Sequence, residues 1–130
     1  MENYVIVSKV KKFIKDKQGF NTSASFFEPV NQDMINCVKE AIEHAKTMNR
    51  KTVLGRDFSF YKEASPPEAA LVVASKIKKL IKEEGGLNTS AQVVEQLSLR
   101  IEHICLNAIR SAVDAKRKTV MDKDFIASDS

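Results

Sequence analysis

The stretch Gly19-Phe20-Asn21-Thr22-Ser23-Ala24 decides the fold, because the chain repeats it 67 residues later as Gly86-Leu87-Asn88-Thr89-Ser90-Ala91. The repeat extends from this stretch in both directions without a gap. Residues 5–58 align with residues 72–125, and 22 of the 54 aligned positions are identical. Two copies are too few for a solenoid, so the duplication predicts two similar units that pair about a pseudo-two-fold axis.

The segment between the copies contains the pair Pro66-Pro67, which breaks a helix and marks a linker. We therefore divide the chain into copy one at residues 1–62, a linker at residues 63–71 and copy two at residues 72–130.

Each copy begins with a short stretch that favours a helix. Ser8 and Ser75 stand at positions that suit a helix N-cap, and apolar residues follow at helical spacing. Glycine then ends the pattern, at Gly19 in copy one and at Gly85-Gly86 in copy two. The spacing predicts a first helix of about ten residues in each copy.

A much longer amphipathic pattern follows, with Thr22 or Ser23 as the expected cap in copy one. Apolar residues recur every three or four positions for about seven turns. A helix of this length cannot bury its apolar stripe against one short neighbour, so it requires the long helix of the other copy. Pro29 stands where copy two has Gln96, and the helix of copy one therefore either begins at Glu28 or kinks there.

Each copy closes with Arg-Lys-Thr-Val, at residues 50–53 and 117–120, followed by Asp-Phe at residues 57–58 and 124–125. Little chain remains for a last helix, because prolines follow copy one and copy two stops at residue 130. The patterns predict an all-α protein with at most six helices and two short loop strands.

The composition restricts the class of protein only loosely. The chain has 21 Lys and Arg against 17 Asp and Glu, and the net charge of +4 weakly favours a polyanionic partner. Residues 1–65 carry +3 and residues 66–130 carry +1. We see no apolar run that could cross a bilayer and no signal peptide. Cys37 and Cys105 therefore indicate buried, reduced thiols in a cytoplasmic protein.

No catalytic site, metal site or cofactor is predicted. His44 and His103 are not shared between the copies, and the cysteines form no spaced set of metal ligands with them. A glycine-rich phosphate loop after a strand is also missing from the pattern. We expect a protein that is not an enzyme.

The order of a long helix, Arg-Lys-Thr-Val and an aspartate seven residues after the arginine resembles the histone fold of archaeal and bacterial histones, over 108 of the 130 residues. Copy two, with Ser75-Lys76-Ile77-Lys78-Lys79 and Leu87-Asn88-Thr89-Ser90-Ala91, resembles single-copy bacterial histones with a truncated last helix. Copy one, with residues 20–28, is more similar to archaeal-type histones that form face-to-face tetramers. The resemblance implies a histone doublet. Its long helices would cross antiparallel in an intramolecular handshake, with each first loop beside the other copy's second loop.

The resemblance also implies sequence-independent binding, bending and compaction of double-stranded DNA in the nucleoid, through the paired loops and the first helices. A lysine and a threonine hydroxyl suit phosphate oxygens, and nothing in the sequence reads base edges. Archaeal histones often have an arginine in the first loop, where this chain has asparagine. The expected DNA contacts are Lys51, Thr52, Lys118 and Thr119 in the second loops, Lys9, Lys12, Lys15, Lys76, Lys79 and Lys82 in the first helices, and Asn21 and Asn88 in the first loops.

Two arginines are given a structural role instead. In the histone family the arginine pairs with the aspartate seven residues on and holds the second loop. The resemblance therefore implies salt bridges between Arg50 and Asp57 and between Arg117 and Asp124.

An assembly module without DNA binding is the alternative function, because the net charge is low and both first loops lack the arginine. Phe26, Phe27 and Tyr61 have no bulky counterparts in copy two, so they either form a surface for further homo-oligomers through copy one or belong to the core. The truncated last helices leave little surface for stacking, and we expect no long filament on DNA.

Overall fold

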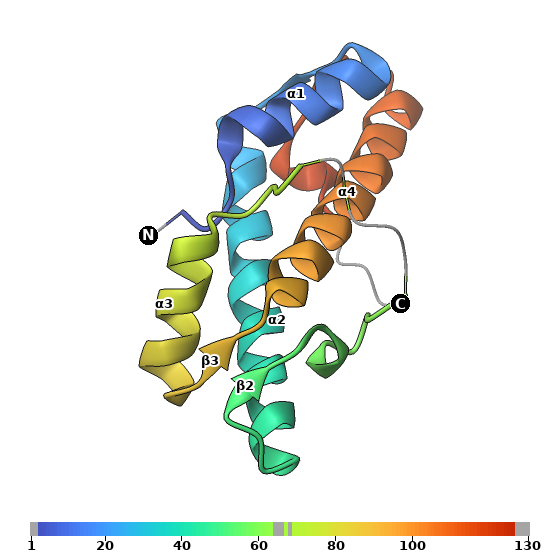
Figure 1. Cartoon of the computed structure of the whole chain (residues 1–130). Helices are drawn as coiled ribbons and strands as arrows, with labels where there is room; N and C mark the ends of the chain where they lie inside the picture. The colour runs from blue at the N-terminus through green and yellow to red at the C-terminus, as the bar shows by residue number, and fades with distance from the viewer. Residues whose placement is uncertain (1–2, 64–66, 68, 127–130) are drawn as a thin grey trace.

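The computed structural model describes residues 3–63, 67 and 69–126 (Figure 1). Each half contains a short helix, a two-residue strand, a long helix, a second two-residue strand and a closing 3-10 turn, and the first half has a further 3-10 turn before its long helix. The helices are α1 (Val7–Gln18), α2 (Phe27–Thr47), α3 (Ala74–Gly85) and α4 (Ala91–Asp114). The strands are β1 (Asn21–Thr22), β2 (Thr52–Val53), β3 (Asn88–Thr89) and β4 (Thr119–Val120), and the 3-10 turns are η1 (Ala24–Phe26), η2 (Gly55–Asp57) and η3 (Asp122–Asp124).

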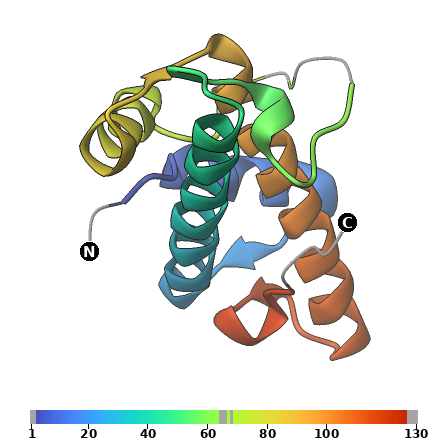
Figure 2. The same cartoon turned by 90° about the horizontal axis from the view of Figure 1, so that it is seen from below.

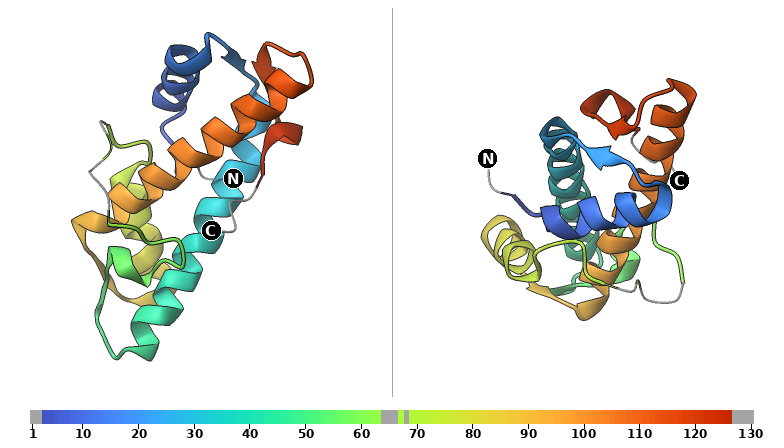
Figure 3. Two further views of the ribbon diagram at one scale, coloured as in Figure 1. Left: turned by 90° about the vertical axis from the view of Figure 1, so that its right-hand side faces the viewer. Right: turned by 90° about the horizontal axis from the view of Figure 1, so that it is seen from above.

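The two long helices cross each other at the centre of the molecule, as the left view of Figure 3 shows. The short helix α1 packs on α4, and α3 packs on α2. Each short helix therefore packs on the long helix of the other half. In Figure 2 the 3-10 turns η2 (green) and η3 (red) lie at opposite ends of α4, and both contact it.

The strands also pair across the halves. Strand β1 runs parallel to β4, with Asn21 opposite Thr119, and β2 runs parallel to β3, with Thr52 opposite Asn88. Both members of each pair come from loops, and the shift of 67 residues exchanges one pair for the other. Two short strands were predicted, in the second loops. The structure has four, because the Asn-Thr segments of the first loops supply their partners.

The chain before α1 and the chain before α3 meet in an antiparallel bridge between Val5 and Val72. The Ile6 amide donates to the Leu71 carbonyl at 2.8 Å, and the Val73 amide donates to the Tyr4 carbonyl at 2.8 Å. These two bonds are again equivalent under the 67-residue shift.

Ser8 and Ser75 are not the caps of the first helices, and this prediction was wrong. The N-cap residues are Ile6 and Val73, neither of which makes a side-chain cap hydrogen bond. The bridge holds both in extended conformation, so each helix begins where the bridge ends and reaches 12 residues. Both helices end at a left-handed glycine, Gly19 with φ 73° and Gly86 with φ 66°.

The long helix of copy one begins at Phe27, so Pro29 lies in its first turn. The first four backbone N–H groups of a helix have no acceptor within that helix, so proline at this position removes no hydrogen bond of α2 itself. Ser23 caps the turn η1 instead, accepting from the Ser25 amide at 3.3 Å. Helix α4 starts at the equivalent of Ala24 and has 24 residues against 21 in α2, because a 3-10 turn replaces the first turn of α2.

One hydrophobic core runs through both halves. It takes its largest fully buried side chains from all four helices and η1, among them Ile14, Met34, Ile77 and Leu97. Phe26 and Phe27 are buried in this core, so they are not a surface for association; Tyr61 stays exposed. No helix in the described residues is long and apolar enough to cross a membrane.

The cysteines Cys37 and Cys105 are free and lie in the same core. Burial raises the pKa of both thiols to about 12, so they are neutral at physiological pH.

In the described residues, no α-helix lies between β2 and residue 63 or between β4 and residue 126. The last helix of each half is reduced to the turn η2 or η3. Four α-helices are therefore described, within the predicted limit of six.

Candidate nucleic-acid interface

The reciprocal strand pairing creates two equivalent loop ends, each built from both halves. We call them the β1–β4 end and the β2–β3 end. The backbone N–H of Asn21 donates to the backbone carbonyl of Lys118 at 3.1 Å, and the backbone N–H of Asn88 donates to the backbone carbonyl of Lys51 at 2.8 Å. The β1–β4 end is formed by Asn21, Lys118 and Thr119, and the β2–β3 end by Asn88, Lys51 and Thr52.

The side chains at these ends are accessible. Lys118 and Asn21 are exposed and Thr119 is half-buried, and the same pattern holds for their equivalents Lys51, Asn88 and Thr52. Each end thus carries an exposed ammonium and an exposed carboxamide beside a half-buried threonine. Ammonium and amide N–H groups and hydroxyls are donors that suit an anionic oxygen.

A brace of identical design holds each second loop. Arg117 Nη1 donates to Asp124 Oδ2 at 2.7 Å and to the Thr119 carbonyl at 3.1 Å. Arg50 Nη1 makes the same two contacts in the other half, with Asp57 Oδ2 at 2.8 Å and the Thr52 carbonyl at 3.1 Å. The second guanidinium nitrogen bonds the other carboxylate oxygen in both halves. Both guanidiniums are thus bonded to an aspartate and to a loop carbonyl of their own half.

Each brace has a fourth partner that sequence reasoning missed. His44 Nδ1 lies 2.7 Å from Asp57 Oδ1, and the Ser111 hydroxyl donates to Asp124 Oδ1 at 2.8 Å. His44 and Ser111 occupy aligned positions, and the difference in residue type conceals their common role in the sequence. Both side chains can hydrogen-bond a carboxylate, and this shared capacity was the available signal.

The two aspartates are strongly acidic. Burial by itself raises the pKa of Asp57, but hydrogen bonds from Arg50, the Leu54 amide and His44 outweigh it and lower the pKa to about 2. For Asp124 the hydrogen bond from Arg117 is the largest cause, and it lowers the pKa to about 2 against the effect of burial. Both aspartates are therefore ionised at every physiological pH.

The first-helix lysines are distributed over several environments. Lys15 belongs to the β1–β4 end, since its Nζ donates to Asn21 Oδ1 at 3.3 Å. Lys12 pairs with Asp16 at 2.7 Å, and Lys79 lies 3.9 Å from Glu83.

The remaining lysines of this group differ in exposure. Lys76 is half-buried and donates to the Asn3 carbonyl at 3.2 Å, whereas Lys82 is exposed at the end of α3. Lys9 lines, with Lys12, an open pocket of about 620 Å³ between α1 and α4. The predicted lysine face is therefore partly engaged by the protein itself.

Lys116 is an exposed cation that the sequence reasoning did not include. It stands two residues before Lys118 with φ 59°, and its copy-one counterpart is Asn49 with φ 56°. Asparagine tolerates the left-handed region better than lysine does. A lysine in place of asparagine at such a turn was the signal in the sequence, and it adds a charge to the β1–β4 end.

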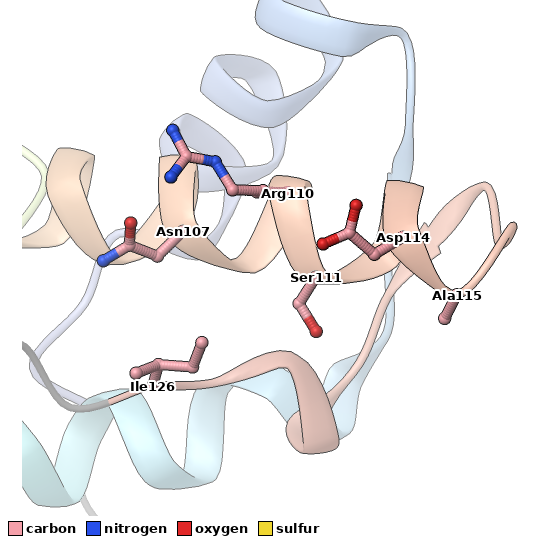
Figure 4. A pocket seen from close by; sticks show the side chains of 6 residues that line it. All are labelled: Asn107, Arg110, Ser111, Asp114, Ala115 and Ile126. Atoms are coloured by element: carbon pink, nitrogen blue, oxygen red, sulfur yellow. The ribbon is translucent and has the colours of Figure 1, made fainter.

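A second open pocket, of about 600 Å³, lies between the C-terminal half of α4 and the chain after η3 (Figure 4). Its lining includes Arg110 and Asp114, which carry opposite charges, so it is not a basic site. No group of His, Cys, Asp or Glu side chains that could hold a metal ion occurs within the described part of the chain.

No protein-family model and no curated protein matches this sequence. Among solved structures, the histone from Methanopyrus kandleri is similar to it in fold, with a TM-score of 0.64 and 14% sequence identity. The similarity covers 92% of this chain and 89% of that chain. The chain therefore has a histone fold.

Proposed function

We propose that this chain is an intramolecular pair of histone folds that binds double-stranded DNA through its phosphates. We keep the boundaries predicted from the sequence repeat, with copy one at residues 1–62 and copy two at residues 72–130. Residues 64–66 and 68 of the linker lie outside the described residues. The similarity to the Methanopyrus kandleri histone supports this arrangement, because 92% of the chain, and so both halves, superposes on a single histone chain.

The observation that carries the DNA proposal is the composition of the two loop ends. Each end gathers a lysine and a threonine from one half and an asparagine from the other, on a loop that an Arg–Asp brace holds in place. These groups suit phosphate oxygens, which position a protein on a duplex without reading its sequence. Because these groups would contact phosphates, we expect binding with little dependence on the DNA sequence.

The affinity should be modest. The net charge is +4, and Lys12 and Lys79 already have acidic neighbours. Neutralisation of about four to six phosphates would give a slope of log K against log salt of roughly −4 to −5. Two phosphate-binding ends on one rigid body favour bending or compaction of the duplex, the work of a nucleoid protein rather than of an enzyme.

The test is a salt series of binding to two duplexes of unrelated sequence, with the wild type beside Lys51→Ala plus Lys118→Ala. The matched control is Lys39→Ala plus Lys46→Ala, which removes two exposed charges from α2 outside the loop ends. We expect equal binding of both duplexes and a slope flatter by about two for the loop variant. Absence of wild-type binding at low salt, or equal losses in both variants, would reject the proposed interface.

A protein–protein assembly module is the second candidate, and one observation favours it. Leu106 and Val113 are 46% and 45% exposed on α4, where copy one has Lys39 and Lys46, and Ile126 is 52% exposed. Apolar side chains in this arrangement favour self-association through copy two rather than through copy one. Light scattering of Leu106→Lys plus Val113→Lys tests it: the module predicts that the wild type forms larger species and the variant does not.

A further inference from the structure

At two places in the interface between the copies, a residue of copy one contacts the residue of copy two with which it is aligned. Val5 bridges Val72, and Asp33 pairs with Arg100; both pairs are separated by the 67 residues of the repeat. A residue that contacts its own counterpart lies on the pseudo-two-fold axis. At such a place, pairing of a half with a second copy of itself would put two identical side chains in contact.

The pair of Asp33 and Arg100 is well formed and largely withdrawn from solvent. Arg100 Nε donates to Asp33 Oδ2 at 2.6 Å, and Arg100 Nη2 donates to Asp33 Oδ1 at 2.9 Å. The two side chains are 9% and 10% exposed. The guanidinium also lies 4.6 Å from the ring centroid of Phe60, a residue of copy one. Arg100 thus has both its carboxylate and its aromatic neighbour in the other half.

The same positions are unfavourable in a pair of identical halves. If copy one of one chain paired with copy one of another chain, Asp33 would face Asp33. If copy two paired with copy two, Arg100 would face Arg100. Like charges in a buried site repel each other, and each also loses the partner that offsets its desolvation.

The backbone contacts that are repeated between the halves do not discriminate. The Val5–Val72 bridge joins identical residues. Strands β1 and β3 have the same sequence, Asn-Thr, and strands β2 and β4 have the same sequence, Thr-Val. The strand pairs would therefore form equally well between identical halves.

We propose that Asp33 and Arg100 select the partner of each half, so that half one pairs with half two and not with a second copy of itself. A duplicated chain needs this selection, because halves that each accepted their own kind would link separate chains to one another instead of pairing within one chain. The inference rests on the proposed intramolecular pairing but not on DNA binding.

The test uses the whole chain, folded and then cut at a protease site inserted between Glu63 and Pro67. The cut protein is dissociated and reassociated, and native mass spectrometry counts the pairs by mass. The variants are Asp33→Leu plus Arg100→Leu, which removes the charges, and the exchange Asp33→Arg plus Arg100→Asp, which restores a pair of opposite charges. An apolar pair can replace a buried ion pair without loss of stability, so the leucine variant is expected to fold.

A mixed pair contains one first half and one second half, whereas an identical pair contains two of the same half. From the wild type and the exchanged variant we expect mixed pairs, with fewer than about one identical pair in ten. The leucine variant should approach the statistical limit, in which about half of all pairs are identical. Identical pairs from the wild type at the level of the leucine variant would overturn the proposal, as would exclusively mixed pairs from the leucine variant.

The uncut chains give a second readout that does not depend on the cut. Refolded at high protein concentration, the wild type and the exchanged variant should elute as single chains, whereas the leucine variant should also form larger species. The proposal is rejected if the uncut leucine variant refolds only to single chains and the cut leucine variant forms only mixed pairs. DNA is absent from both measurements, so failure here is distinct from failure of the proposed function.

Discussion

The two loop ends share one backbone design and differ in charge. Each has a parallel strand pair and an Arg–Asp brace with the same contacts. The β1–β4 end adds Lys15 and Lys116, whereas at the β2–β3 end Asn49 replaces Lys116, and Glu83 and Glu84 stand beside the equivalent lysine, Lys82.

The cross-pairing makes this difference larger than a comparison of the halves suggests. The more basic first helix, that of copy one, joins the more basic second loop, that of copy two. The charge of a composite site therefore cannot be inferred from either half alone. Duplication kept the residues that hold the backbone and left the surrounding ones free to diverge, and the following predictions test that division.

The largest difference between the halves is expected at the starts of the long helices. Gln96→Pro places proline at the sixth residue of α4, where it removes a helical hydrogen bond, and it also removes the bond from Gln96 to the Lys62 carbonyl at 2.9 Å. It should cost at least about 3 kcal/mol. Pro29→Gln should cost less than about 1 kcal/mol, because Pro29 breaks no bond in the first turn. Urea unfolding measures both, and equal losses would contradict the different helix starts.

The braces are expected to be equivalent. Asp57→Ala and Asp124→Ala each remove a buried carboxylate that is bonded to an arginine, a backbone amide and a second side chain. Each substitution should lower the free energy of unfolding by about 3 kcal/mol. Losses that differ by more than the error of denaturant unfolding would show that His44 and Ser111 are not interchangeable partners. His44→Ser, which copies the other half, is the control and should change little.

The pH dependence of stability should reflect the same two aspartates. Their pKa values of about 2 lie below the ordinary value of 3.8, so the folded state favours the charged form. This stabilisation is complete above the ordinary pKa and is lost as the pH falls through the folded pKa. Unfolding midpoints should be steady near pH 5 and fall between about pH 4 and pH 2. The double variant Asp57→Asn plus Asp124→Asn should flatten this fall; an unchanged acid limb would contradict the assignment.

The smallest effects are expected from exchanging the turn residues between the ends. Lys116→Asn should weaken DNA binding by about threefold and flatten the salt slope by about one, while Asn49→Lys should do the reverse. The first change should also stabilise the fold by a few tenths of a kcal/mol, because asparagine tolerates the left-handed turn. Binding isotherms for DNA at fixed salt concentration measure both variants. If neither variant changed the affinity, the two loop ends would not differ in their contacts with DNA.

Much of the fold could be predicted from local pattern. The repeat, the helix–loop–long helix order and the glycine stops at Gly19 and Gly86 depend on spacing and backbone conformation, which the sequence displays directly. The helix starts could not be predicted, because a bridge between distant segments sets them at Val7 and Ala74. The equivalence of His44 and Ser111 was hidden for the same reason: each acts on a carboxylate 13 residues away.

By itself the sequence determined the all-α class, the duplication, the lack of any motif for catalysis and the residue types that a phosphate-binding loop requires, since these follow from periodicity and composition. Only the tertiary structure decided which residues act together. Asn21 meets Lys118 and not Lys51, and Asp33 meets Arg100, because each long helix packs on the short helix of the other half. The resulting crossing brings together segments far apart in the chain, and that juxtaposition produces both the loop ends and the ion pair on the axis.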